Sequence, residues 1–229
     1  MHVNDHIPTV GRQRPTVVTF HGTGFRETPA EHLKIARDAR VLVSTLDLWL
    51  LAPNDTTWMP QMDDLDWLAT FRNPHNGPLR IGHAPTNRAL KSTHQFIEAC
   101  ERLSKALPIE MVMIEGMSWQ ECLAVKGTCD ILFDQTAYGY GGNAIEAWAM
   151  GIPVVCGAPD DTLAEYDRRF GDIPFVAAEQ HTIRDALLDL VEPAARAQWG
   201  TKGRAHAERY HSYKVGVERL APIYEEVSS

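Results

Sequence analysis

The sequence predicts an α/β protein in which a Rossmann-like domain with a parallel sheet follows a truncated second lobe of the same kind. Apolar, β-rich runs alternate with helical patterns from about residue 78 onward, which is typical of βαβ units and a parallel sheet. Only two β-rich runs precede residue 60, so we expect the first lobe to be incomplete. The 229 residues are 44% apolar and include six Trp and seven Phe, which is sufficient for a folded core.

Each element is predicted from its own local pattern. Short runs of β-branched and aromatic residues predict strands, and Gly, Pro and Asn clusters separate them from their neighbours. The helix over 92–107 is the clearest, because its apolar residues recur at the spacing of one helix face. The expected strands are 16–20, 41–44, 79–84, 109–114, 129–133 and 152–156, and the expected helices are 29–39, 92–107, 118–126, 143–150 and 183–191, with helical patterning continuing to about residue 227.

These elements predict four segments along the chain. Residues 1–14 are polar and without periodicity, so we expect a loose arm. A partial N-terminal lobe follows over 15–77 and includes a linker near 60–77, where Pro, Asn and Asp are frequent. The complete domain spans 78–212. The last segment, 213–229, is a helix that we expect to pack back on the N-terminal lobe.

Composition excludes several classes of protein. Lys and Arg total 22 and Asp and Glu total 30, so the net charge of −8 argues against binding of duplex nucleic acid. We expect no nucleic acid as a partner, except in the role of an acceptor substrate. No apolar stretch approaches the ~20 residues of a membrane span, and the start of the chain lacks the pattern of a secretory signal. The four cysteines form no C-x-x-C pair, which favours buried free thiols and a cytoplasmic location.

A glycine-rich loop over 138–143 is the strongest local signal for a binding site. Its three glycines precede a helix that we expect to begin near Asn143, so backbone amides can approach an anion at a helix N-terminus. Glu146, expected on the first turn of that helix, could accept hydrogen bonds from vicinal hydroxyls such as those of a ribose. The alternative is a tight turn into a buried helix.

The second signal is the loop that follows the strand over 79–84. Arg88 and Lys91 place two cations before the next helix, where the helix dipole disfavours positive charge unless an anion is bound. A diphosphate is a suitable anion, because the Arg guanidinium can donate two parallel hydrogen bonds to phosphate oxygens and the Lys ammonium adds a localised positive charge. The alternative is that Arg88 and Lys91 are two solvated surface charges. Because two loops of one sheet both have features suited to an anion, a shared binding site is favoured.

Other polar residues stand at the ends of the expected strands. His21 follows the first strand and could face a cleft between the lobes, although a lone histidine is more often structural. Asp134 follows a later strand. It is either a polar residue of the cleft or part of a loop that caps the next helix. The ten histidines show no metal-ligand spacing, and no P-loop, nucleophile elbow or dinucleotide motif is present. We therefore expect neither a metal nor a cofactor.

These motifs resemble a known family. Residues 80–93 resemble the donor-phosphate loop of retaining GT-B glycosyltransferases of the family-4 type. Residues 129–135, the glycine loop and then 146–155 are similar to the carboxylate motif and following strand of that family. The His-Gly-Thr sequence at 21–23 resembles its His-Gly-Ser segment at the interdomain cleft. The resemblance covers roughly 15–200 and implies a GT-B-like fold, in which 78–212 binds the nucleotide-sugar donor and the acceptor lobe is shortened.

The resemblance also implies roles for individual residues. Arg88 and Lys91 would bind the diphosphate, Glu146 would hold the ribose and His21 would line the sugar site; these four are the candidate catalytic residues. Tyr138 stands where the family has the first of two glutamates eight positions apart. The other donor-binding candidates are Gly22, Thr23, Thr86, Asn87, Glu115, Gly116, Asp134, Tyr138, Gly141, Gly142 and Asn143, with Glu115 and Gly116 near the base.

The implied function is metal-independent transfer of a sugar, hexosyltransferase-like, from a nucleotide-diphosphate sugar to an acceptor, with retention of configuration. The expected partners are a nucleotide sugar and an acceptor. Tyr138 and the short first lobe leave two alternatives open. One is a protein that binds a nucleotide sugar without transferring it. The other is the donor-binding subunit of a two-chain enzyme, whose N-terminal lobe is completed by a second copy or by another protein.

Overall fold

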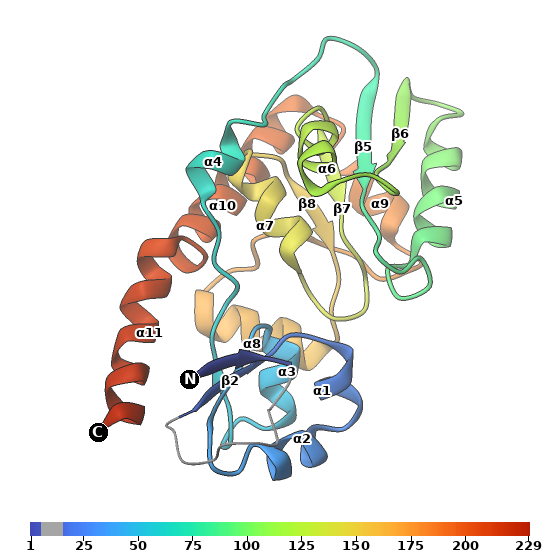
Figure 1. Ribbon diagram of the computed structural model, residues 1–229. Coiled ribbons are helices and arrows are strands. Elements are labelled where there is room, and N and C mark those ends of the chain that lie inside the picture. The colour runs from blue at the N-terminus through green and yellow to red at the C-terminus, as the bar shows by residue number, and fades with distance from the viewer. Residues whose placement is uncertain (6–15) are drawn as a thin grey trace. The chain divides into compact units, whose positions relative to one another are not determined.

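The computed structural model describes residues 1–5 and 16–229 and divides into two compact units (Figure 1). Unit 1 comprises Met1–Met62 and Tyr213–Ser229, and unit 2 comprises Asp63–Ser212. Each unit contains a parallel sheet with helices, so the predicted α/β, Rossmann-like fold class is confirmed.

Unit 1 is built on a four-stranded parallel sheet in the order β1 (His2–Asn4), β2 (Val17–Phe20), β3 (Arg40–Val43) and β4 (Thr57–Trp58). β1 differs from the loose arm that the polar composition of the first residues led us to expect. It forms an edge strand because its backbone pairs with β2 in parallel register, which requires no apolar pattern. The remainder of that arm, over 6–14, lies outside the described residues.

Helices cover both faces of the unit 1 sheet. One face buries Val18 and Phe20 against α1, α2 and α3, and the other buries Val17 and Leu42 against Ile223 of α11. Neighbouring residues of β2 point to opposite faces because side chains alternate along a strand. The helices of this unit are α1 (Thr23–Glu27), α2 (Pro29–Ile35), α3 (Leu46–Leu51) and α11 (Tyr213–Ser228).

Unit 2 is built on a five-stranded parallel sheet in the order β6-β5-β7-β8-β9. The chain passes from β5 to β6 on one side and then crosses to β7 on the other side of β5. The connections that leave β5 and β7 therefore run in opposite directions along the sheet, which makes this pair of strand ends the topological switch point where open α/β sheets bind ligands. The strands are β5 (Leu79–His83), β6 (Ile109–Met113), β7 (Ile131–Phe133), β8 (Val154–Cys156) and β9 (Val176–Ala177).

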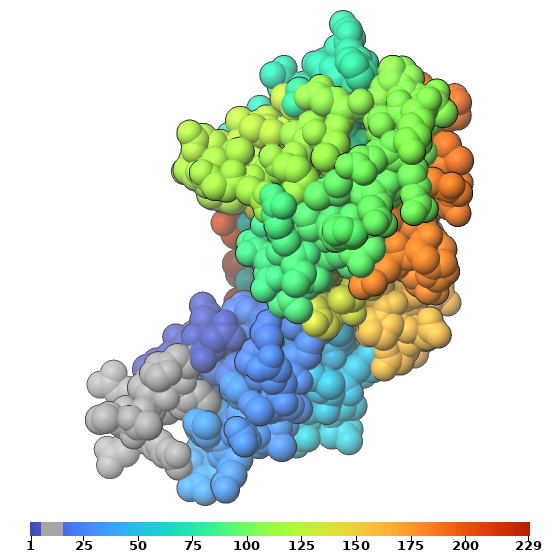
Figure 2. All heavy atoms as spheres, turned by 90° about the vertical axis from the view of Figure 1, so that its right-hand side faces the viewer, coloured from blue at the N-terminus to red at the C-terminus, as the bar shows by residue number. Residues whose placement is uncertain are grey.

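Helices pack on both faces of the unit 2 sheet. On one face, Ile81 and Phe133 pack with Phe96 of α5 and Leu187 of α9 in the main core, and Figure 2 shows α5 (green) and α9 (orange) side by side on the surface. On the other face, Val112 packs against α6. The helices are α4 (Leu65–Ala69), α5 (Thr93–Leu103), α6 (Trp119–Lys126), α7 (Gly142–Ala149), α8 (Asp160–Phe170), α9 (Ile183–Leu188) and α10 (Pro193–Tyr210). Within the described ranges, no helix is both long enough and apolar enough to cross a bilayer.

All four cysteines are free thiols, as the sequence predicted. Three are buried and Cys122 is half-buried. Burial raises the pKa of Cys100 to about 12 and that of Cys129 to about 11, because the charged thiolate is poorly solvated in the core. These two side chains therefore behave as small apolar groups.

A close approach between α7 and α10 depends on Gly203. A Cβ built on Gly203 would overlap the ring of the fully buried Trp148. Glycine to alanine in a helix ordinarily stabilises by about 1 kcal/mol, but here the methyl group has no space. We expect Gly203→Ala to lower the free energy of unfolding by about 1–3 kcal/mol in urea denaturation. The exposed neighbour Thr201→Ala, on the same helix, should change it by less than about 0.5 kcal/mol; equal stability of the two variants would contradict this packing.

Candidate functional site

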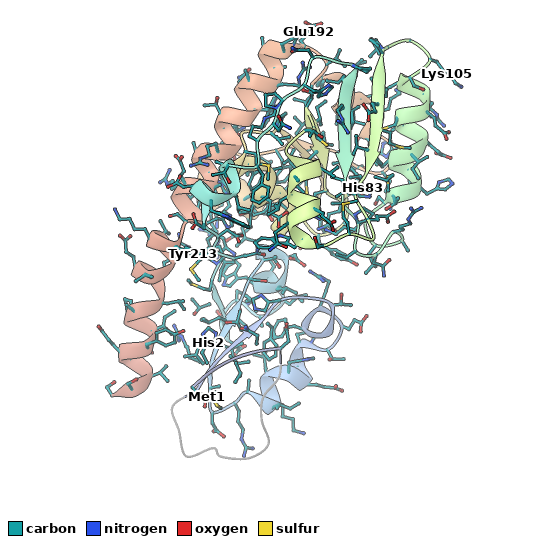
Figure 3. All side chains as sticks on the ribbon, turned by 45° about the horizontal axis from the view of Figure 1, so that its top comes forward. Met1, His2, His83, Lys105, Glu192 and Tyr213 are labelled. Atoms are coloured by element: carbon teal, nitrogen blue, oxygen red, sulfur yellow. The ribbon has the colours of Figure 1, made fainter. Side chains whose placement is uncertain are left out.

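The carboxyl ends of β5 and β7 are joined by the side chain of His83, the last residue of β5 (Figure 3). Its Nδ1 lies 3.0 Å from the carbonyl oxygen of Phe133, which can only accept, so Nδ1 carries the proton. Its Nε2 then accepts from the hydroxyl of Thr93 at 2.8 Å, at the start of α5. Burial lowers the pKa of His83 to about 4, so the ring is a neutral structural link between the strands that carry the site.

A buried ion pair connects the loop after β5 to the loop after β7. Lys91 Nζ lies 2.8 Å from Asp134 Oδ1, and Asp134 Oδ2 accepts the backbone N–H of Gly141 at 2.8 Å. The Asp134 side chain is 0% exposed and that of Lys91 is 17% exposed. Burial alone would raise the pKa of Asp134, but the Lys91 ammonium and the Gly141 amide outweigh it and hold the pKa below its usual range. Lys91, Asp134 and Gly141 thus form one charge-compensated unit.

The Lys91 ammonium also lies beside the glycine-loop backbone. A Cβ built on Gly141 would be 3.9 Å from Lys91 Nζ and 3.6 Å from Asp134 Oδ2. Gly139 has a φ of +86°, in the left-handed region that glycine adopts without strain. The glycine loop and the loop after β5, which the sequence singled out separately, therefore meet at one place.

Arg88 has a different partner from Lys91. Its Nε donates to Glu115 Oε1 at 2.9 Å, and its Nη2 makes a second hydrogen bond to Glu115 Oε2, so the guanidinium and the carboxylate form a bidentate pair. This pairing raises the pKa of Arg88 and lowers that of Glu115. The Arg88 side chain is 60% exposed. Next to it, Asn87 Oδ1 accepts the amides of Ala89 and Leu90, which stabilises the turn of the loop.

The N-terminus of α7 follows the glycine loop directly. The helix begins at Gly142, with Gly141 as its N-cap and no side-chain cap. The amides of Gly142 and Asn143 have no partner inside the helix, because the carbonyls that they would need lie before its first turn. The side chain of Asn143 donates from Nδ2 to the carbonyl of Ala84 at 2.8 Å, which ties α7 to the loop after β5. The start of α7 therefore presents positive electrostatic potential at the switch point.

Glu146 lies one residue further into α7 than the sequence led us to expect. The helix starts at Gly142, so Glu146 is its fifth residue and not part of the first turn. Its Oε1 accepts the indole Nε1–H of Trp119 at 2.9 Å, and its Oε2 is paired with Lys126 Nζ. The carboxylate is 12% exposed. Both donors come from α6, the helix that precedes β7.

Lys126 and Trp119 were not among the predicted site residues. Lys126 occupies the last turn of α6, where a lysine is ordinary because it complements the helix dipole, yet its side chain is only 1% exposed. Its burial could have been predicted from one feature of the sequence. Lys126 stands three residues after Leu123, which places both on the buried face of that helix. Trp119 is 48% exposed and its ring lies 5.1 Å from that of Trp67.

The remaining predicted residues are divided between the two units. In unit 1, His21 follows β2 and is exposed; its backbone amide donates to Asp5 Oδ1 at 2.8 Å, and its Nε2 lies 3.4 Å from Asn4 Oδ1. Gly22 caps α1, which begins at Thr23. In unit 2, Thr86 and Gly116 are exposed in the loops after β5 and β6, and Tyr138 is half-buried in the loop after β7.

The arrangement in unit 2 supplies two kinds of recognition chemistry. The Lys91 ammonium and the first amides of α7 suit an anion with several oxygens, and the Glu146 carboxylate suits hydroxyl donors. Within 1–5 and 16–229, no three His, Cys, Asp or Glu side chains are grouped as metal ligands.

Comparison with known proteins was made by sequence and by structure. Neither a protein-family profile nor a curated protein matches the sequence. Sucrose-phosphate synthase from Thermosynechococcus elongatus superimposes with a TM-score of 0.67 at 15% identity, over 93% of this chain and 68% of that chain. HepE from Anabaena, in complex with UDP-glucose, superimposes with a TM-score of 0.64 at 12% identity, over 93% of this chain and 73% of that chain.

A glycosyltransferase from Rickettsia africae also matches, with a TM-score of 0.61 at 13% identity, over 93% of this chain and 70% of that chain. Identities this low establish the fold alone. The chain therefore has the GT-B-like fold that its motifs predicted, with two Rossmann-like units.

Proposed function

We propose that this chain is a glycosyltransferase that takes a sugar from a nucleoside-diphosphate sugar, with retention of configuration. The observation that carries the proposal is the contact between Lys91, Asp134 and Gly141, because it brings a cation and the start of α7 together at the switch point of the sheet. The GT-B-like fold supports it, since one structure with this fold is a complex with UDP-glucose.

In this proposal the diphosphate lies between Lys91 and the amides of Gly142 and Asn143. Departure of the sugar leaves negative charge on the diphosphate, and fixed positive charge stabilises that product without reorganisation. Arg88 would add a second cation by exchanging the Glu115 carboxylate for phosphate oxygens. The chain's own cations and helix N-terminus provide this charge, so the proposal involves no metal and no cofactor.

Other residues complete the proposed donor site. Glu146 accepts the ribose hydroxyls, and Glu115 with Gly116, at the end of β6, lies on the side of the base. The loop after β5 contributes Thr86 and Asn87, and the loop after β7 contributes Tyr138. In the proposal these side chains surround the diphosphate and the sugar. His21, Gly22 and Thr23 of unit 1 are proposed for the sugar site from the resemblance of the His-Gly-Thr segment.

Calorimetric titration with UDP, GDP and ADP tests the site. The variant Lys91→Met/Asp134→Asn removes the ion pair as a neutral unit, and an asparagine still offers an oxygen to the Gly141 amide. We expect the tightest-binding diphosphate to lose about ten- to a hundredfold in affinity, because one charge-assisted contact is lost. Lys202→Met removes a lysine that pairs with Asp172 at 2.7 Å elsewhere in unit 2 and should bind as the wild type does. Unchanged affinity in the double variant would refute the assignment of Lys91.

A turnover assay separates transfer from binding alone. Tyr138, in place of a motif glutamate, favours the second candidate function, a protein that holds a nucleotide sugar without transferring it. UDP-glucose and GDP-mannose would be incubated with the protein, and release of the free diphosphate would be measured. Turnover that is lost in Lys91→Met/Asp134→Asn supports the transferase. Tight binding of either compound without any release, across a panel of acceptor sugars, favours the binding protein.

A further inference from the structure

Lys126 is a buried lysine held between two polar side chains of α7. Its Nζ donates to Asn143 Oδ1 at 2.8 Å and is paired with Glu146 Oε2. These two partners are three residues apart and so lie on the same face of α7. Burial of an ammonium with 1% side-chain exposure is costly unless it is paired, and the Glu146 carboxylate is its partner here.

We propose that Lys126 is a positioning residue that sets Glu146 for recognition of a ribose diol and holds Asn143 at the start of α7. The inference rests on the proposed function, in which Glu146 receives the ribose, and it deepens that proposal by naming the residue that positions the carboxylate. Lys126 itself, at 1% exposure, does not reach the ligand and acts through its two partners.

The contact with Asn143 fixes the orientation of that amide. An ammonium group can only donate, so the oxygen of Asn143 must face Lys126. The amide nitrogen then faces the carbonyl of Ala84 and donates to it at 2.8 Å. Lys126 thereby holds the start of α7 against the loop after β5, which carries the proposed phosphate-binding residues.

The contact with Glu146 selects the chemistry of its ligand. Each carboxylate oxygen already accepts from one protein donor, Trp119 at Oε1 and Lys126 at Oε2. A carboxylate has about four acceptor sites, so two remain, which match the two hydroxyl donors of a ribose diol. Because Lys126 compensates the negative charge, the site favours neutral hydroxyls over a second cation.

The test compares ribonucleotides with analogues that lack the diol. Wild type and Lys126→Met would be titrated by calorimetry with UDP, GDP and ADP and with their 2′,3′-dideoxy counterparts. We expect the wild type to bind its best ribonucleoside diphosphate at least about tenfold more tightly than the dideoxy form, and Lys126→Met to reduce that ratio below about threefold. The affinity for the dideoxy form should fall less than that for the ribo form, because only the ribo form also loses the contact with Glu146. Lys202→Met is the matched control and should keep the wild-type ratio.

A second variant keeps the test valid if Lys126→Met does not fold. Lys126→Gln replaces the ammonium by a neutral amide that can still donate a hydrogen bond, and we expect it to fold and to show the same reduced ratio. A ratio of about tenfold in either variant would overturn the inference, as would an equal loss of affinity for the ribo and dideoxy forms, which indicates a purely structural role. If the wild type binds none of the three diphosphates, the proposed function fails instead, so the two failures are distinguishable.

Discussion

Asp134→Ala should lower the free energy of unfolding by about 3 kcal/mol, measured by urea denaturation. The variant leaves the Lys91 ammonium without its carboxylate and removes the acceptor of the Gly141 amide, both at a buried position. We expect the low end of the range for broken buried pairs, because the Lys91 side chain retains 17% exposure.

Asp172→Ala provides the control for this prediction. Asp172 also pairs with a lysine, Lys202, at 2.7 Å, but its side chain is 67% exposed. Exposed ion pairs contribute about 0–1 kcal/mol, so its loss should be barely measurable. In the variant Lys91→Met/Asp134→Asn, the loss of stability should be smaller than for Asp134→Ala, because no unpaired charge remains. Equal losses for Asp134→Ala and Asp172→Ala would contradict the buried pair.

Stability should also fall steeply between pH 6.5 and pH 5. Burial lowers the pKa of His83 to about 4 and that of His206 to about 2, against 6.5 for an unperturbed histidine. Below pH 6.5 the unfolded chain binds protons that the folded protein excludes, so each histidine reduces the free energy of unfolding by about 1.4 kcal/mol per pH unit. Together the two histidines should lower the free energy of unfolding by about 4 kcal/mol at pH 5. Above about pH 7.5 both rings are neutral in either state and this loss is absent.

Urea denaturation at pH 7, 6 and 5 measures this slope. His83→Asn removes one titrating group, and we expect it to reduce the slope by about half, whatever its effect on stability at pH 7. His206 lies in a different environment, where its Nε2 is 3.0 Å from the Tyr140 hydroxyl, so the two contributions should be additive. A free energy of unfolding that is constant from pH 7 to pH 5 would contradict the burial of both rings.

Much of the fold could be predicted from local patterns. The strands of unit 2 from β5 to β8 are runs of apolar residues bounded by loops, and each lies within one or two residues of its predicted bounds. Several missed elements lacked such a pattern, whereas α3 and α4 were missed although they are short and largely apolar. β1 and the two-residue strands β4 and β9 form through pairing with a neighbour, and α8 is rich in charge and buries two polar residues, Thr162 and Glu165, beside Tyr166. Pairing and packing partners are not visible in a local window.

The candidate site was predictable in its place but not in its pairing. Strand ends and glycine spacing located the loops, whereas the partner of each charge depends on which loops meet in space. Arg88 and Lys91 are three residues apart, yet Arg88 pairs with Glu115 and Lys91 with Asp134. Lys126 is the extreme case, because an ordinary helix-terminal lysine becomes a buried partner only when α6 and α7 pack together.

The central claim is that a diphosphate binds between Lys91 and the start of α7. Amide chemical shifts recorded on the ¹⁵N-labelled protein during titration with UDP, GDP and ADP test it directly. The account predicts that the largest shift changes occur at the amides of Gly141, Gly142 and Asn143. The affinity obtained from these changes should be lower in Lys91→Met/Asp134→Asn. Saturable binding of a diphosphate that changes other amide shifts but not those of these three residues would contradict the claim.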